Sequence, residues 1–242
     1  MTLAFVVLLV VVAVASRLLP GERGLELGGA VGRLVMAGLA LWVLSSLGWL
    51  REAGLVRFGD RSAWMSVLTP LIYVTLVYPL LLTGDLALNV GRPVLAALVA
   101  ANGFSAGVME EIVFRGLVLC ALLRHWGRDR GGIAGSLALS SVLFAAPHAL
   151  NLLTEPNATR VLAQLGWALL LGVVFGMLVL AGESVWPVAA LHGLGNAVVH
   201  LNRLGREVDV AGTSAVLLVL APLPLLLYAG FMLRRRQARL RA

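Results

Sequence analysis

The feature that most constrains this chain is a series of apolar runs, each long enough to cross a lipid bilayer as a helix. Such a crossing needs about 20 apolar residues, and charged residues make up only 13% of the 242-residue chain. No polar stretch is long enough to bury a core of its own. We predict an all-α, polytopic membrane protein, a bundle of about eight transmembrane helices around a buried cavity. The predicted spans are residues 2–16, 28–50, 64–83, 93–123, 131–153, 161–182, 185–201 and 213–233.

Arginine placement predicts the orientation of the bundle. All 19 basic residues are arginines, and the side that would hold both termini carries more of them, including the tail RRRQARLR. The positive-inside rule therefore predicts an integral protein of a bacterial-type cell membrane with both termini in the cytoplasm. Short arginine segments between apolar runs indicate contact with membrane lipid and no nucleic-acid partner. The arginines counted on the opposite side are Arg17, Arg23, Arg33, Arg92, Arg160, Arg203 and Arg206.

The chain divides into three parts within a single membrane domain. Residues 1–90 hold about three N-terminal spans. Residues 91–205 contain every polar motif discussed below and form the predicted core. Residues 206–242 supply the last span and the Arg-rich tail.

Three ionisable residues fall inside the predicted span 93–123, in the sequence VMEEIVFRGLV. A charge inside the hydrocarbon is costly unless it is paired or faces a polar cavity. Glu111 and Arg115 are four residues apart, so they share a helical face and predict an ion pair. Glu110 lies about 100° around the helix and is left outside that pair. We interpret Glu110 as an acid that takes and returns protons; the alternative is a buried ionic cluster that only fixes helix packing.

Two further motifs place polar residues in neighbouring spans. In FAAPH, Pro147 precedes His148, and a proline at this place bends the helix and frees a carbonyl group. In HGLGN, His192 and Asn196 are four residues apart and share a face, which suits two donors aimed at an oxyanion. The alternatives are an interfacial histidine and an interhelical hydrogen bond. Together with Glu110, these residues are the components of a water-activating hydrolytic site.

The three motifs resemble those of a known family. EEIVFRG fits EExxxR, FAAPH fits FxxxH and HGLGN fits HxxxN, the motifs of the CAAX protease and bacteriocin-processing family, also called glutamate-type CAAX proteases. Members are intramembrane endopeptidases, so the resemblance implies a catalytic cavity and a membrane-associated peptide or protein as substrate.

The resemblance also implies a role for each residue of the motifs. Glu110 would be the general base that activates water, and His148 would help to position or polarise that water. His192 and Asn196 would stabilise the tetrahedral oxyanion. The pair Glu111–Arg115 would hold the architecture of the site.

A catalytic metal is the main chemical alternative. Glu110, His148 and His192 offer the two-histidine, one-carboxylate set of a catalytic zinc, although the zincin motif HExxH is absent. We favour a glutamate-activated water without an obligatory cofactor, with a divalent metal such as zinc as the alternative. Two other functions compete with proteolysis: a proton-coupled small-solute transporter, which usually shows internal repeats that are not evident here, and a non-catalytic membrane scaffold.

Overall fold

The computed structural model describes residues 14–77, 90–153, 155, 157–204 and 220–239. Every regular element in these ranges is helical, which confirms the all-α prediction for this part of the chain. The elements are α2 (Glu22–Ser46), α3 (Arg61–Ile72), η1 (Tyr73–Val77), α5 (Pro93–Glu111), η2 (Ile112–Leu119), α6 (Cys120–Trp126), α7 (Arg130–Ala145), η3 (Ala146–Leu153), α8 (Ala158–Gly182), α9 (Trp186–Arg203) and α11 (Leu223–Arg239).

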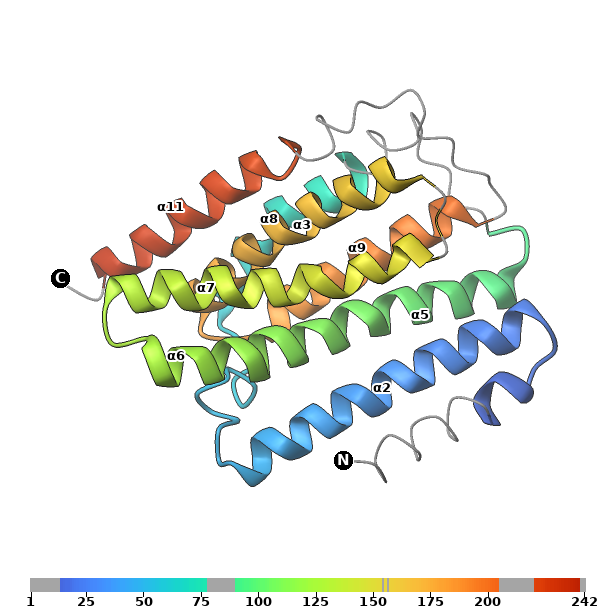
Figure 1. The fold of residues 1–242 in the computed structure, drawn as a ribbon, viewed down its shortest axis with the longest axis horizontal. Helices are drawn as coiled ribbons and strands as arrows, with labels where there is room; N and C mark the ends of the chain where they lie inside the picture. Colours follow the sequence, from blue (N-terminus) through green and yellow to red (C-terminus); the bar gives the residue numbers. More distant parts are fainter. Residues whose placement is uncertain (1–13, 78–89, 154, 156, 205–219, 240–242) are drawn as a thin grey trace.

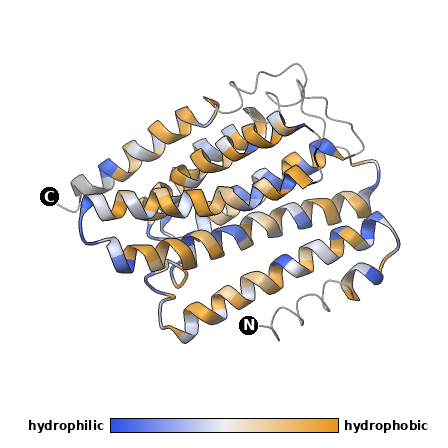
Figure 2. Cartoon of the chain, in the orientation of Figure 1, coloured by the Kyte–Doolittle hydropathy of each residue, from blue (hydrophilic) through white to orange (hydrophobic). Residues whose placement is uncertain are grey.

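Many large apolar side chains lie on the surface of the bundle, and a few charged side chains lie inside it. Large hydrophobic residues are exposed, for example Trp42 at 67% and Leu227 at 77%, whereas Glu111 and Arg115 are buried. Hydrophobic residues cover most of the helix lengths, and hydrophilic residues gather toward the ends (Figure 2). Within the described ranges, three segments are long and apolar enough to cross a membrane: Glu22–Ser46, Arg130–Leu153 and Val161–Gly182. The chain is an integral membrane protein, and the larger number of spans stays a prediction.

Parts of three predicted spans lie outside the described residues. They are most of span 2–16, the end of span 64–83 and the start of span 213–233. Within the described ranges, α2 begins at Glu22, earlier than the predicted residue 28. Arg33 lies inside this helix, as it does in the predicted span 28–50, and the side of the membrane to which it belongs stays a prediction. The residues that follow Arg33 are apolar as far as Leu44, and the helix continues to Ser46.

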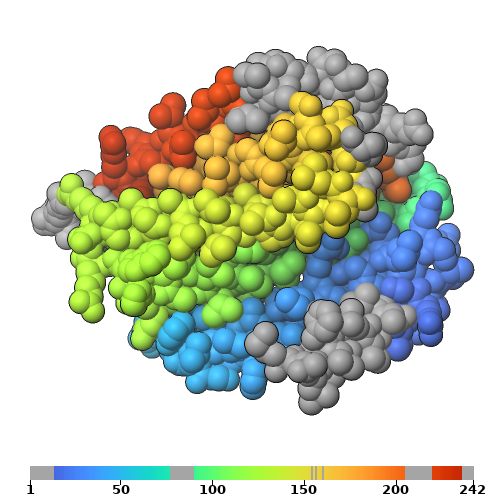
Figure 3. All heavy atoms as spheres, viewed as in Figure 1, coloured from blue at the N-terminus to red at the C-terminus, as the bar shows by residue number. Residues whose placement is uncertain are grey.

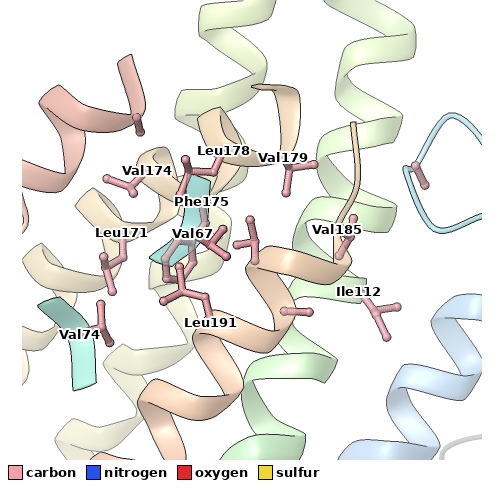
Figure 4. Close-up of a cluster of buried hydrophobic side chains, with 14 of the residues drawn as sticks. Val67, Val74, Ile112, Leu171, Val174, Phe175, Leu178, Val179, Val185 and Leu191 are labelled. Carbon is pink, nitrogen blue, oxygen red and sulfur yellow. The ribbon is translucent and has the colours of Figure 1, made fainter. Parts of the chain in front are cut away.

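The helices lie side by side along the long axis of the molecule (Figure 1). The helix α5 packs most extensively against α9 and then against α2, while α8 packs against α7 and α11. The main core lies around α8, where Phe175 and Leu178 meet Leu191 of α9 and Val67 of α3 (Figure 4). Side chains of α6 and α7 fill the face between α2 and α11 (Figure 3). The helix α5 thus lies between α2 and α9, and its polar residues face neighbours on both sides.

Glycines bring α5 and α9 into backbone contact. A Cβ atom added to Gly107 would lie 2.5 Å from the Gly193 nitrogen and 2.6 Å from the His192 carbonyl carbon. A Cβ added to Gly103 would lie 3.0 Å from the backbone of Asn196. Small residues allow this close approach in membrane helices. The crossing places the HGLGN motif directly beside the helix that carries Glu110.

Two helices change their geometry next to the motifs. The segment from Pro93 to Trp126 is continuously helical, as the long predicted span 93–123 indicates, but it is π-helical over Ile112–Leu119. Such π-helical insertions are frequent at functional sites. The helix α7 ends at Ala145, and Pro147 lies in the 3₁₀-helical segment that follows. The predicted disturbance of the helix before His148 is confirmed.

Candidate active site

The centre of the candidate site is the fully buried carboxylate of Glu111. Its Oε1 atom lies 3.1 Å from Nη1 of Arg115 and 2.7 Å from Nδ1 of His192. The predicted pair between Glu111 and Arg115 is therefore confirmed. The contact with His192 joins α5 to α9 and adds a third member to the pair. An ionised carboxylate only accepts hydrogen bonds, so Nδ1 of His192 is assigned as the donor of the hydrogen bond to Glu111.

Glu110 lies on the other edge of the same imidazole. Its Oε2 atom is 3.5 Å from Nε2 of His192, and its side chain keeps 22% of its surface exposed. Among the residues that the structure describes, Glu110 forms no ion pair with an arginine. The two adjacent glutamates are thus held differently, because Glu111 has a guanidinium partner at contact distance and Glu110 has only the imidazole. This is the difference that the helical spacing predicts.

Two aromatic rings enclose the buried guanidinium of Arg115. Its Cζ atom lies 4.2 Å from the centroid of Phe144 and 5.5 Å from that of Phe175. Its Nη2 atom donates to the carbonyl oxygen of Gly172 at 3.4 Å. A cation in contact with aromatic faces is attracted by the ring quadrupole, and the attraction grows when water is absent. Residues from α7 and α8 therefore fix the position from which Arg115 holds Glu111.

His148 joins the cluster through Phe144. The centroid of Phe144 lies 5.6 Å from the ring of His148 and 5.9 Å from the ring of His192. Both histidines therefore border the same aromatic side chain. The Nδ1 atom of His148 is buried and has no hydrogen-bond partner in the described part of the chain. A buried imidazole nitrogen without a partner is available to a water molecule or a substrate atom.

Asn196 lies one helical turn after His192 on α9 and is half-buried. Its backbone packs against Gly103 of α5. Its side-chain amide makes no hydrogen bond with any described residue. The structure thus places all six predicted residues on packed helices. Glu110, Glu111, Arg115 and His192 are in direct contact, and His148 is linked to them through Phe144. Asn196 lies at the crossing of α5 and α9.

A cavity of about 400 Å³ reaches the cluster through Arg115. Its other walls include the loop residues Arg51 and Arg57, together with Cys120 of α6 and Glu183. The residues predicted to be catalytic do not line this cavity. The cavity therefore extends from the loop end of the bundle to Arg115. The partly exposed side chain of Glu110 does not face it.

The residues offered as zinc ligands do not form a metal site in this arrangement. No three His, Cys, Asp or Glu side chains among the described residues come together as a metal ion would require. Glu110 and His192 approach each other, but Nδ1 of His192 is engaged by Glu111 and the contact to His148 is indirect.

Three residues near the site are not among the predicted site residues. Phe144 is the first residue of FAAPH, and the sequence assigns it no role of its own. Phe175 lies in an apolar run of α8 that offers no distinguishing signal. Arg33 does have a signal, because it is a charge inside a helix of apolar residues.

The fold and the cluster define a helical membrane protein that buries an acid–arginine–histidine network. Residues 92–198 match the family model described as type II CAAX prenyl endopeptidase Rce1-like, so this part of the chain is similar to that family. The match contains all six predicted site residues and confirms the resemblance that the three motifs show. No curated protein and no solved structure matches the chain. Because the family is one of CAAX-type peptidases, the match supports an intramembrane protease.

Proposed function

We propose that the protein is an intramembrane endopeptidase in which Glu110 activates a water molecule for attack on a peptide bond. The observation that carries the proposal is the unequal pairing of the two glutamates. Arg115 and His192 hold Glu111, whereas Glu110 is partly exposed and has no arginine partner among the described residues. A carboxylate that is not neutralised by a guanidinium can accept a proton, which a general base must do.

Glu110 begins the reaction by accepting a proton from a water molecule. The water oxygen attacks the carbonyl carbon of the scissile bond and leaves a tetrahedral oxyanion. His192 acts as an imidazolium whose Nδ1–H is held by Glu111, so that Nε2–H is free to donate to the oxyanion. Before the proton moves, the charges of Glu110, Glu111, Arg115 and the imidazolium of His192 sum to zero, and after it moves the oxyanion keeps that sum at zero, which suits a site away from water. The Nε2 to Glu110 distance of 3.5 Å exceeds an ordinary hydrogen bond, so an oxygen atom can take that donor.

The second half of the reaction returns the proton. Glu110 gives the proton to the amide nitrogen, the carbon–nitrogen bond breaks, and the products are an amine and a carboxylic acid, which then ionises. Asn196 would be the second donor to the oxyanion. His148, whose Nδ1 atom has no described partner, would orient the attacking water.

The family match supports a membrane-associated peptide of the CAAX type as substrate. We further propose that the loop between α2 and α3 faces the cytoplasm together with both termini. This loop and the end of α6 are joined by an ion pair between Arg124 and Glu52 and carry several arginines. The positive-inside rule places such an end in the cytoplasm.

The test is cleavage of a prenylated peptide ending in a CAAX sequence by purified protein in lipid nanodiscs, followed by mass spectrometry. We expect the wild-type protein to release the C-terminal fragment and Glu110→Gln to release none above the uncatalysed background. The Gln side chain keeps the shape of Glu110 but cannot accept the proton. Full cleavage by a correctly folded Glu110→Gln protein would remove Glu110 from the role of base.

A further inference from the structure

A second charged residue lies inside the bundle, close to Glu110 but outside the three motifs. Arg33 is half-buried near the middle of α2 (Glu22–Ser46). Its only hydrogen bond to a described residue goes to the carbonyl oxygen of Asn102 on α5, at 3.4 Å. Among the described residues, no carboxylate forms an ion pair with it. A guanidinium has five N–H donors, so most of its donors have no protein acceptor.

Two carboxylates lie near Arg33 without forming an ion pair with it, those of Glu110 and Glu26. Glu26 is already engaged, because its Oε2 atom accepts a hydrogen bond of 2.6 Å from Asn102. Glu110 approaches His192 instead. Arg33 therefore lies within the electrostatic reach of the proposed base without neutralising it.

The guanidinium packs closely against its own helix and Asn102. Gly29 lies one turn earlier on α2, and a Cβ atom at that position would be 3.2 Å from Nη1 of Arg33 and 2.7 Å from Oδ1 of Asn102. An alanine at position 29 would crowd both side chains. A half-buried guanidinium without a carboxylate partner can bind an anion through two parallel hydrogen bonds to its two acceptor oxygens.

The depth of Arg33 selects the source of the anion. Arg33 is 11 residues from the start of α2 at Glu22 and 13 from its end at Ser46, which places it roughly 16 Å from the nearer helix end. Lipid phosphates lie at the bilayer surface, so they are poorly placed to reach it. A peptide bound with its scissile bond at Glu110 brings its own carboxylate to this depth.

We propose that Arg33 binds a carboxylate of the peptide substrate and thereby selects which peptides reach Glu110. This inference rests on the proposed function. A carboxylate can come from the free C-terminus or from an acidic side chain, and both present the same two oxygens to the guanidinium. Arg33 is then a specificity residue on α2, the helix that packs against α5.

The test compares binding of three fluorescent prenylated CAAX peptides to the full-length protein in phosphatidylcholine nanodiscs. One peptide has a free C-terminus, the second is its C-terminal amide, and the third is the amide with one acidic side chain in the last three positions. We expect the wild-type protein to bind a carboxylate-bearing peptide about tenfold or more tightly than the neutral amide. Which of the two charged peptides shows the preference identifies the source of the carboxylate.

The variants separate recognition from other effects of the charge. Arg33→Gln is expected to abolish the preference, and Arg33→Lys to retain part of it because the charge remains without the planar fork. Arg23→Gln, the same change at an exposed position of the same helix, is the matched control and should keep the preference. If Arg33→Gln does not fold, Gly29→Ala is the alternative variant. Its added Cβ crowds the guanidinium of Arg33 while the charge stays, so it should weaken the preference.

Equal binding of all three peptides by the wild-type protein, or an undiminished preference in Arg33→Gln, would overturn the proposal. A preference that vanishes when phosphatidylglycerol replaces phosphatidylcholine would assign the anion to lipid and overturn it as well. Cleavage kinetics distinguish recognition of the carboxylate from an effect on Glu110. Loss of recognition raises KM only for the charged peptide. An effect through Glu110 lowers kcat for charged and neutral peptides alike. A retained binding preference without any cleavage would refute the endopeptidase and leave the role of Arg33 intact.

Discussion

Breaking the pair between Glu111 and Arg115 should destabilise the protein far more than removing both partners together. The side chains are 0% and 1% exposed, and their atoms lie 3.1 Å apart. Removing one partner of a buried ion pair leaves an uncompensated charge and costs about 3–5 kcal/mol. Glu111→Leu also takes away the acceptor for Nδ1 of His192, so its cost lies toward the upper end of that range. Replacing the pair by apolar residues of similar volume is often nearly neutral.

The assay is a double-mutant cycle of Glu111→Leu and Arg115→Met, with the free energy of unfolding measured by denaturant titration in mixed micelles. We expect each single variant to lose about 3–5 kcal/mol and the double variant to lose less than either. Arg124→Met is the control, since its pair with Glu52 is 42% and 51% exposed and should contribute below about 1 kcal/mol. Additive losses, or a Glu111→Leu effect no larger than that of Arg124→Met, would refute the structural role assigned to the pair.

Two further predictions follow from the packing around the site. Gly107→Ala should strongly reduce both stability and cleavage, because its Cβ would lie 2.5 Å from the backbone of α9. Gly38→Ala is the control: its Cβ would have nothing within 4 Å, so it should be neutral or raise the melting temperature. Melting curves and cleavage assays of both variants measured in parallel test this. Phe144→Leu should cost about 1–3 kcal/mol of unfolding free energy through lost contact with Arg115, and Phe231→Leu at an exposed position should not. Equal effects of the two members of either pair would contradict these predictions.

The part of the site that lies on one helix could be predicted from the sequence. The spacing of Glu111 and Arg115 fixes their relative direction on any helix, and the same spacing separates Glu110 from them. This is why the distinction between a paired and an unpaired acid needs no knowledge of tertiary structure. The change of helix geometry at Pro147 is local in the same sense, because proline prevents a regular helix at its own position.

Contacts between helices could not be predicted in the same way. The hydrogen bond between His192 and Glu111 depends on where α5 crosses α9, and glycines permit a close crossing without specifying which residues meet. Phe175 meets Arg115 only because α8 packs beside η2, and its sequence context is uniformly apolar. The contact of Arg33 with Asn102 depends likewise on where α2 packs against α5.

The measurement that tests the central claim most directly is a side-by-side comparison of Glu110→Gln and Glu111→Gln for CAAX-peptide cleavage and for unfolding free energy. The account predicts that Glu110→Gln is as stable as the wild-type protein and does not cleave, while Glu111→Gln is measurably less stable. Cleavage by Glu110→Gln at the wild-type rate, or a loss of stability confined to Glu110→Gln, would show that the two acids have the opposite roles or that neither activates water.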